Sequence, residues 1–348
     1  MTMFCSNFLS NSLRRSYYDG ASLILTESKG NESDVFYSLA GEKFEKKVKL
    51  DFSNPFEENY DIGIFGFGSI SGILCLHQYD EEDHDQILLW NPATQTIKLL
   101  PPSEVEEAES YIPDLLDIYV MSRLHGFGYD LVKNDYKWLG ENFGPSWEMY
   151  SLMSDSWKVL DVDMPYSSDR TEGTQVYMDG VCHWLCEKDE KHSPAGPCLV
   201  SFYLSNEVFL ITPISSDEDD CFDVGAKWIN LAVLNGSIAL ISFQKKTTTF
   251  HISILGELSI KESWTNLFNV GPLACVQRPI IMGTKGEIFF IKKDMEVAWF
   301  DLSTQMIEQL GYKAESLRCR IVNYKESILP SLKKEKKRKH SSITGISS

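Results

Sequence analysis

Five residues in the middle of the chain are of the types that bind zinc: Cys182, His183, Cys186, His192 and Cys198. Zinc sites usually need four nitrogen or sulfur ligands that converge as a tetrahedron. Cys182 and His183 are adjacent in an apolar, strand-like run, so their side chains would point to opposite faces of a sheet. The pattern therefore favours an ordinary strand over a metal site, and we predict neither a metal nor another cofactor.

Other motifs that could carry chemistry are incomplete. The glycines of the stretch 63–68 (GIFGFG) lack the GxGxxG spacing and the lysine of a phosphate-binding loop. We expect these glycines to allow close packing of strands. The sequence contains no G-x-S-x-G turn and no H-E-x-x-H helix, and its pattern indicates no histidine as the partner of a reactive cysteine. We assign no catalytic residue and predict that the protein is not an enzyme.

The formal net charge of −17 is concentrated in acidic runs, which we consider the best candidates for partner binding. A phosphate backbone would be repelled by this charge, so we predict no nucleic-acid binding. The run at 80–85 lacks the glycine and the terminal glutamate of an EF-hand loop, which indicates a solvated loop. We expect the acidic runs to bind a protein with a basic surface, through Asp80, Glu81, Glu82, Asp83, Asp217, Glu218, Asp219 and Asp220.

The end of the chain has a different composition, KKEKKRKHSSITGISS. Such a polar and basic segment cannot form a core, so we predict a disordered tail at residues 333–348. It is read either as a nuclear localisation signal or as a solubilising tail. The signal would consist of Lys333, Lys334, Lys336, Lys337, Arg338 and Lys339.

The remaining composition indicates a soluble protein of the cytoplasm, the nucleus or both. No window approaches the roughly 18 apolar residues of a membrane span, so we predict no membrane association. The eight cysteines show no regular framework, and several lie in apolar runs, which is typical of reduced thiols.

A hairpin pattern repeats along the chain. A large apolar residue is followed seven positions later by another, with turn-forming residues between them, as in Trp90-Asn91-Pro92-Ala93-Thr94 and Ile97. A looser copy with a longer connection runs from Ile254 to Trp264. The first residues of the copies are 46 to 60 residues apart, a period typical of propeller blades. The five regular copies are Tyr37–Phe44, Trp90–Ile97, Tyr150–Trp157, Phe202–Phe209 and Phe300–Ile307.

A glycine followed by an apolar run precedes most of these hairpins, as at Gly72, Gly180, Gly236 and Gly286. Each blade is thus expected to have an inner strand and an outer hairpin, and six blades form an all-β propeller-like ring. We expect the third blade to be short by one strand. The run 318–324 has no hairpin of its own, and we expect it to complete the first blade and close the ring.

Five motifs in order resemble the F-box-associated interaction domain of plant F-box proteins, the group that includes S-locus F-box and F-box/kelch-repeat proteins. They are Trp90–Thr94, Leu124–Asp130 with Asp135–Lys137, Tyr150–Leu152 with Asp155–Lys158, Lys261–Thr265, and Tyr324–Ser327.

The resemblance implies a substrate receptor of an SCF-type ubiquitin ligase, which binds the protein to be ubiquitinated while an F-box binds a Skp-type adaptor and, through it, the cullin. We find no F-box in these residues, so adaptor and cullin are expected partners only if an F-box lies upstream. The alternative is a propeller that binds proteins without a ligase connection. We divide the chain into a remnant at 1–16, the propeller-like domain at 17–332 and the tail at 333–348.

Overall fold

A computed structural model describes residues 22–27, 34–55, 62–66, 68–78, 86–103, 123–141, 147–162, 175–186, 197–214 and 228–327. Within these ranges the chain is all β, apart from one 3-10 turn, η3 (Lys261–Ser263). In the described part of the chain, no helix has the length and apolar character needed to span a membrane. The tail predicted to be disordered, residues 333–348, lies outside the described residues.

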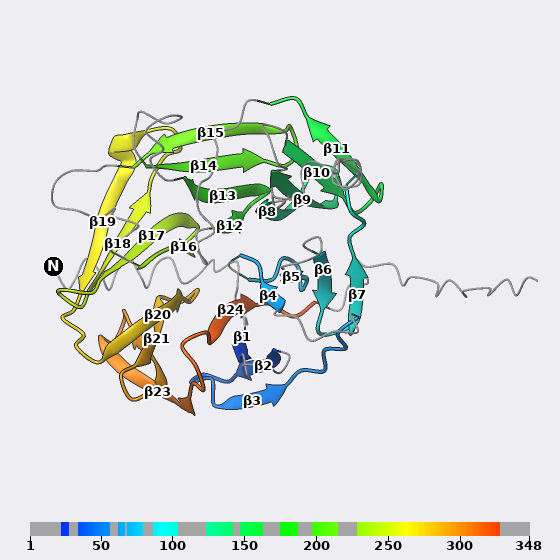
Figure 1. The fold of residues 1–348 in the computed structure, drawn as a ribbon. Coiled ribbons are helices and arrows are strands. Elements are labelled where there is room, and N and C mark those ends of the chain that lie inside the picture. Colours follow the sequence, from blue (N-terminus) through cyan, green and yellow to red (C-terminus); the bar gives the residue numbers. More distant parts are fainter. Residues whose placement is uncertain are drawn as a thin grey trace, which may run out of the picture.

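The strands form six antiparallel sheets of four strands each, arranged as blades around a central axis (Figure 1). From the axis outward, blade 1 contains β24 (Arg320–Tyr324), β1 (Ser22–Glu27), β2 (Val35–Ala40) and β3 (Lys46–Lys49); blade 2 contains β4 (Ile62–Ile64), β5 (Leu74–Gln78), β6 (Gln86–Asn91) and β7 (Thr96–Leu99); blade 3 contains β8 (Arg123–Asp130), β9 (Asp135–Glu141), β10 (Trp147–Ser151) and β11 (Ser156–Leu160). Blade 4 contains β12 (Gln175–Met178), β13 (Val181–Cys186), β14 (Cys198–Tyr203) and β15 (Val208–Pro213); blade 5 contains β16 (Trp228–Leu234), β17 (Ser237–Gln244), β18 (Thr249–Leu255) and β19 (Trp264–Val270); blade 6 contains β20 (Val276–Met282), β21 (Glu287–Lys292), β22 (Glu296–Asp301) and β23 (Met306–Lys313).

The expected ring closure is confirmed. β24 is the innermost strand of blade 1 and pairs with β1, with Ile24 opposite Val322. The backbone of Gly68, next to β4, also bridges Asn323 in parallel. Two ends of the chain that are about 300 residues apart thus share one sheet, which leaves no open edge where the ring closes.

Four of the five predicted hairpin pairs are confirmed as directly opposed residues: Trp90–Ile97, Tyr150–Trp157, Phe202–Phe209 and Phe300–Ile307. Their turns share one geometry, in which the residue before the second strand has a positive φ of 53° to 61°. A turn of constant length fixes the register of the two strands, which explains the constant spacing.

The other two copies also form the predicted hairpins, but with a different register. In blade 1, Tyr37 lies opposite Lys49, and Phe44 belongs to the turn, where its φ is 56°. The turn of blade 1 is one residue longer than those of the regular copies. In blade 5, Trp264 lies opposite Leu255 rather than Ile254.

The predicted inner strands are the second strands of their blades, because each blade has a further strand on the axis. The two are joined by tight turns such as Asp179-Gly180 and Asn235-Gly236, where both residues have positive φ. This is the type I′ geometry that matches the twist of a hairpin. The expectation that blade 3 lacks a strand was wrong, since β8 to β11 form a complete sheet.

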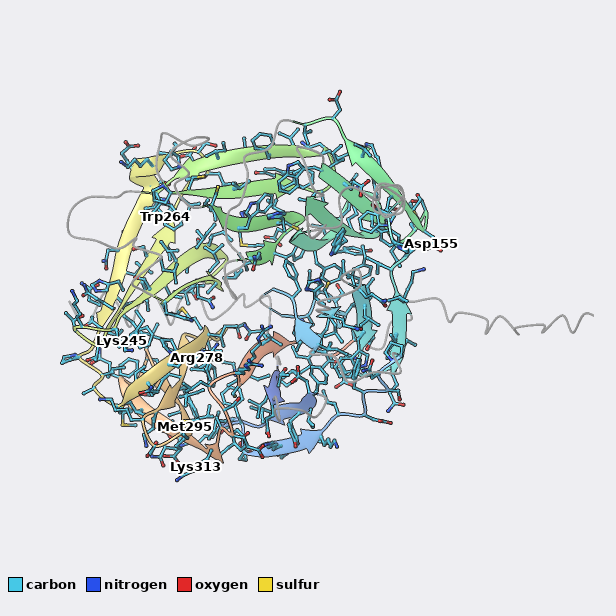
Figure 2. The ribbon with its side chains drawn as sticks, in the orientation of Figure 1. Asp155, Lys245, Trp264, Arg278, Met295 and Lys313 are labelled. Carbon is cyan, nitrogen blue, oxygen red and sulfur yellow. The ribbon has the colours of Figure 1, made fainter. Side chains whose placement is uncertain are left out.

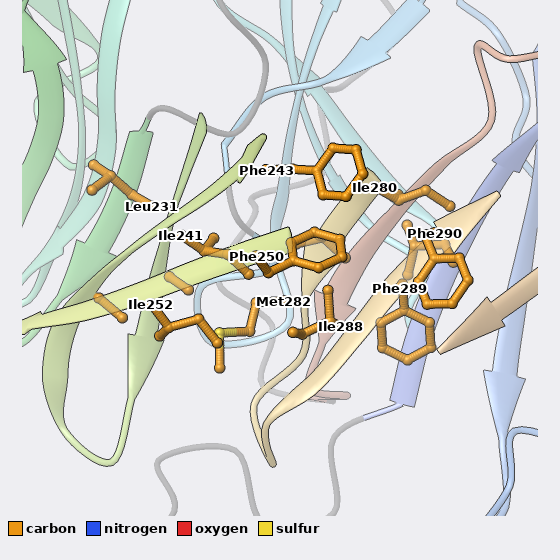
Figure 3. Packing of buried hydrophobic residues seen from close by; sticks show 14 of the residues in the cluster. Leu231, Ile241, Phe243, Phe250, Ile252, Ile280, Met282, Ile288, Phe289 and Phe290 are labelled. Atoms are coloured by element: carbon orange, nitrogen blue, oxygen red, sulfur yellow. The ribbon is translucent and has the colours of Figure 1, made fainter. Parts of the chain in front are cut away.

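The core lies between neighbouring blades, where apolar faces of adjacent sheets meet. Figure 3 shows Phe250 and Ile252 of blade 5 packed towards Met282 and Ile288 of blade 6. Between blades 1 and 2, the ring of Trp90 lies 5.1 Å from that of Phe36. Each blade therefore depends on its neighbours for the burial of its faces.

Candidate protein-binding surface

The tryptophan-asparagine motif at the end of β6 has a structural role. The Asn91 side-chain oxygen accepts hydrogen bonds from the backbone N–H groups of Ala93 (3.0 Å) and Thr94 (3.3 Å), which stabilises the turn. Its side-chain nitrogen donates to the carbonyl of Ser327 at 3.0 Å. One amide thus fixes a hairpin turn and the chain that leaves the closing strand.

The aspartate that ends β8 forms a buried ion pair. The Asp130 carboxylate lies 2.8 Å from the ammonium of Lys137, which also donates to the carbonyl of Leu204 in blade 4 at 2.7 Å. The side chains of Asp130 and Lys137 are 0% and 3% exposed. Burial would raise the pKa of Asp130, but the bonds from Lys137 and from two backbone N–H groups lower it overall. The pair links blade 3 to blade 4.

The residues considered for zinc do not form a metal site within the described residues. His183 is buried on β13, with its Nδ1 2.8 Å from the Ser201 hydroxyl. Cys182 packs against Gly126 of blade 3. His192 lies outside the described residues, and in the ranges that are described no three metal-binding groups converge.

The glycines at 63–68 include one that only glycine can occupy. A Cβ atom on Gly68 would lie 2.1 Å from the carbonyl oxygen of Asn323. The neighbouring N–H of Ser69 donates to the same oxygen at 2.9 Å. Close strand packing therefore explains Gly68, as the sequence predicts.

The inner edges of blades 2, 3 and 4 line a hollow of about 360 Å³, part of which is open to solvent. Its lining includes Phe65, Ile70, His125, Phe127 and Tyr177. Apolar and aromatic groups dominate this lining, and no acidic or basic side chain other than the His125 imidazole is among them.

The two faces of the ring differ in their connections. At one face, which we call the short-turn face, the first strand of a blade joins the second and the third joins the fourth, mostly through turns of two to five residues. At the other face, which we call the long-connection face, the second strand joins the third and each blade joins the next. The eight internal gaps of more than one residue in the described ranges all begin and end at this face: 28–33, 56–61, 79–85, 104–122, 142–146, 163–174, 187–196 and 215–227.

Both predicted acidic runs belong to such gaps and lie outside the described residues. The first run follows the end of β5 and consists of Asp80, Glu81, Glu82 and Asp83. The second follows the end of β15 and consists of Asp217, Glu218, Asp219 and Asp220. The strand ends on either side lie at the long-connection face. The basic residues of the predicted localisation signal also lie outside the described residues: Lys333, Lys334, Lys336, Lys337, Arg338 and Lys339.

Exposed lysines gather on the long-connection face over blades 5 and 6, a feature that sequence reasoning missed. Lys245 and Lys246 form the β17–β18 turn, Lys293 lies after β21, and Lys313 ends β23 (Figure 2). Backbone hydrogen bonds hold these segments side by side, since Leu273 donates to Thr248, Lys293 to Cys275, and Ala314 to Met295. The lysines are up to 68 residues apart in sequence, so only the ring brings them to one surface.

The fold defines the class of the protein: a six-bladed β-propeller. Residues 24–337 match the family described as F-box associated beta propeller domain, and the chain belongs to that family. The family resemblance predicted from the motifs is thus confirmed.

Individual relatives agree with this family. The chain is 24% identical over 282 residues to the F-box protein CPR1 of Arabidopsis thaliana, a match of 71% of this chain and 63% of the relative. It is 22% identical over 222 residues to the F-box/kelch-repeat protein At3g23880 of the same plant, covering 61% of this chain and 54% of the relative. The chain thus matches about half to two thirds of the length of these relatives. Among solved structures, TolB from Acinetobacter baumannii has a TM-score of 0.52 at 9% identity, over 88% of this chain and 67% of that one, which shows the fold alone.

Proposed function

We propose that this chain is the substrate-recognition domain of an SCF-type ubiquitin ligase receptor and binds its protein substrate through the long-connection face. The observation that carries the proposal is that the longest connections between strands, those of ten residues or more, all lie at one face of a rigid ring. Binding residues are often found on loops that a rigid scaffold positions. The protein's contribution is then positional: it holds a substrate near the ubiquitin-carrying partner.

Charge supports a polar mode of recognition. The lysines over blades 5 and 6 lie on the same face as the strand ends that flank the acidic runs. A partner of matching charge would be steered to this face and oriented on it. The acidic runs fit a basic segment of the partner, and the lysines fit an acidic one.

The ligase connection follows from the relatives, which are named as F-box proteins. In this proposal the adaptor and cullin join through an F-box that precedes the propeller in the complete protein. The working compartments are the cytoplasm, the nucleus or both, with the basic tail as the nuclear signal.

The proposal is tested by proximity labelling of the tagged chain in plant cells with the proteasome inhibited. The face variant combines Lys245→Glu, Lys246→Glu and Lys293→Glu. The matched control carries the same change at three exposed lysines of the short-turn face, Lys43, Lys261 and Lys285. We expect the face variant to lose labelled proteins that the control variant retains.

Equal labelling by the two variants would show that recognition occurs elsewhere on the molecule. Labelling of a Skp-type adaptor and a cullin supports the ligase connection. Partners that depend on the face but appear without adaptor and cullin would support the alternative, a propeller that binds proteins on its own.

A further inference from the structure

Two cysteines face each other across the central strands of blade 4. Cys186 is the last residue of β13 and Cys198 the first residue of β14, and the ladder places them directly opposite each other. They lie at the long-connection face, on either side of the segment 187–196. Both are unbridged thiols. Both belong to the set of residues considered for zinc and rejected from the sequence pattern, and among the described residues no three metal-binding groups converge.

The geometry of this pair suits a disulfide. Directly opposed residues of antiparallel strands have Cα atoms about 4.5–5.5 Å apart. Disulfides join residues whose Cα atoms are about 4.4–6.8 Å apart, so little backbone movement is needed. Cys186 and Cys198 are both buried. The register therefore places the two thiols side by side in the reduced protein.

The environment of Cys198 differs from that of two other buried thiols, Cys75 and Cys182. Its hydrogen bond with Cys186 lowers the pKa of Cys198 below its usual value, although burial opposes this effect. Burial alone raises the pKa of Cys75 and of Cys182 far above the usual value. Cys75 lies opposite Leu89, and Cys182 opposite Phe202, so neither has a cysteine across the ladder.

We propose that Cys186 and Cys198 form an oxidation site, at which a peroxide converts the two thiols into a disulfide across β13 and β14. The Cys198 thiolate attacks one oxygen of hydrogen peroxide and becomes a sulfenic acid, and the displaced hydroxide takes up the thiol proton as water. The Cys186 sulfur then forms the S–S bond and breaks the S–O bond, and its proton leaves with the hydroxyl group as a second water. Two thiols lose two electrons, and one peroxide is reduced to two waters.

The disulfide would tie together the two strand ends that flank the segment 187–196. A covalent link at that position reduces the freedom of the unfolded chain and stabilises blade 4. The inference does not depend on the proposed function, since it concerns only the thiols and their oxidant.

The test uses the folded chain of residues 1–348 treated with hydrogen peroxide. Remaining thiols are then alkylated with N-ethylmaleimide under denaturing conditions, and the digested peptides are analysed by mass spectrometry. We expect Cys186 and Cys198 to lose alkylation together, to appear in one linked species, and to recover after dithiothreitol. Cys75 and Cys182 should remain alkylatable at the same peroxide concentration.

Matched variants separate this pair from neighbouring thiols. Cys186→Ala should abolish the linked species, whereas Cys182→Ala should keep it. Near-ultraviolet circular dichroism checks that each variant is folded. If Cys186→Ala does not fold, the proposal is judged on the peroxide treatment of the wild-type chain alone. The proposal is overturned if Cys198 is oxidised to the sulfinic acid while Cys186 stays a thiol, if the link forms only in urea, or if both thiols persist when the more exposed Cys275 has been oxidised.

Discussion

Replacement of Lys137 by methionine should greatly destabilise the propeller. Methionine fills a similar volume but carries no charge, so Asp130 would remain buried without its cation. At 2.8 Å and an effective dielectric constant of about 20, the two charges attract each other by about 6 kcal/mol. The cost of their burial offsets part of this energy, and removal of one partner of a buried pair typically costs about 3–5 kcal/mol. We expect the free energy of unfolding to fall by about that amount.

The assay is equilibrium unfolding in urea, with Lys158→Met as the matched control. Lys158 pairs with Glu207 at 2.5 Å, but the lysine side chain is 60% exposed. Exposed pairs contribute about 0–1 kcal/mol, so the control should lose little stability. The reasoning is refuted if Lys137→Met costs no more than Lys158→Met.

The same variant should change the pH dependence of stability. In the native chain the pKa of Asp130 is lowered on folding, so its contribution to stability is present above the unfolded value of about 3.9 and is lost as the pH falls through the folded pKa. Without Lys137, burial dominates and raises the pKa of Asp130, so protonation then stabilises the fold. The stability difference between the two chains should therefore narrow on acidification, and a gap that stays constant from pH 7 to pH 4 would contradict this assignment.

Three further outcomes are expected. Gly68→Val should lower the melting temperature by several degrees, because its Cβ would collide with the carbonyl of Asn323; calorimetry beside the variant Gly256→Ala, whose Cβ would come no nearer than 3.3 Å to another atom, checks that the effect is specific. His183→Gln should reduce the loss of stability between pH 6.5 and pH 3, since burial lowers the pKa of His183 to about 3 and the unfolded chain takes up the proton first; identical urea midpoints for variant and wild type across that range would contradict it. Changing the four acidic residues Asp217–Asp220 to their amides should slow the association of a basic partner at low salt more than it speeds dissociation, and an unchanged on-rate and salt dependence, measured by surface plasmon resonance, would place recognition elsewhere.

The hairpins could be predicted from the sequence because their information is local. Trp90 and Ile97 face each other because a four-residue turn separates their strands, and the same turn recurs in three other blades. Where the turn is longer, as before Lys46, the same spacing places the second large residue, Phe44, in the turn. Turn length therefore limits this kind of prediction.

Apart from β24, the innermost strands could not be predicted in the same way. β4 has only three residues, and β8 contains glycines that pack against the next blade. A Cβ on Gly128 would lie 2.5 Å from Leu204, a residue of blade 4 that no local pattern relates to it. These strands are specified by neighbouring blades, so alternation of polar and apolar residues is weak in them.

The sequence by itself determined the number of blades, the ring closure and the family, because these depend on a repeated hairpin and on motifs within single segments. Tertiary structure decided which groups meet: the lysines at 245 and 313 on one face, Lys137 beside Leu204, and Cys186 opposite Cys198. The physical reason is that the position of a side chain around the ring depends on blade packing and strand register, and both are set by contacts between residues distant in sequence.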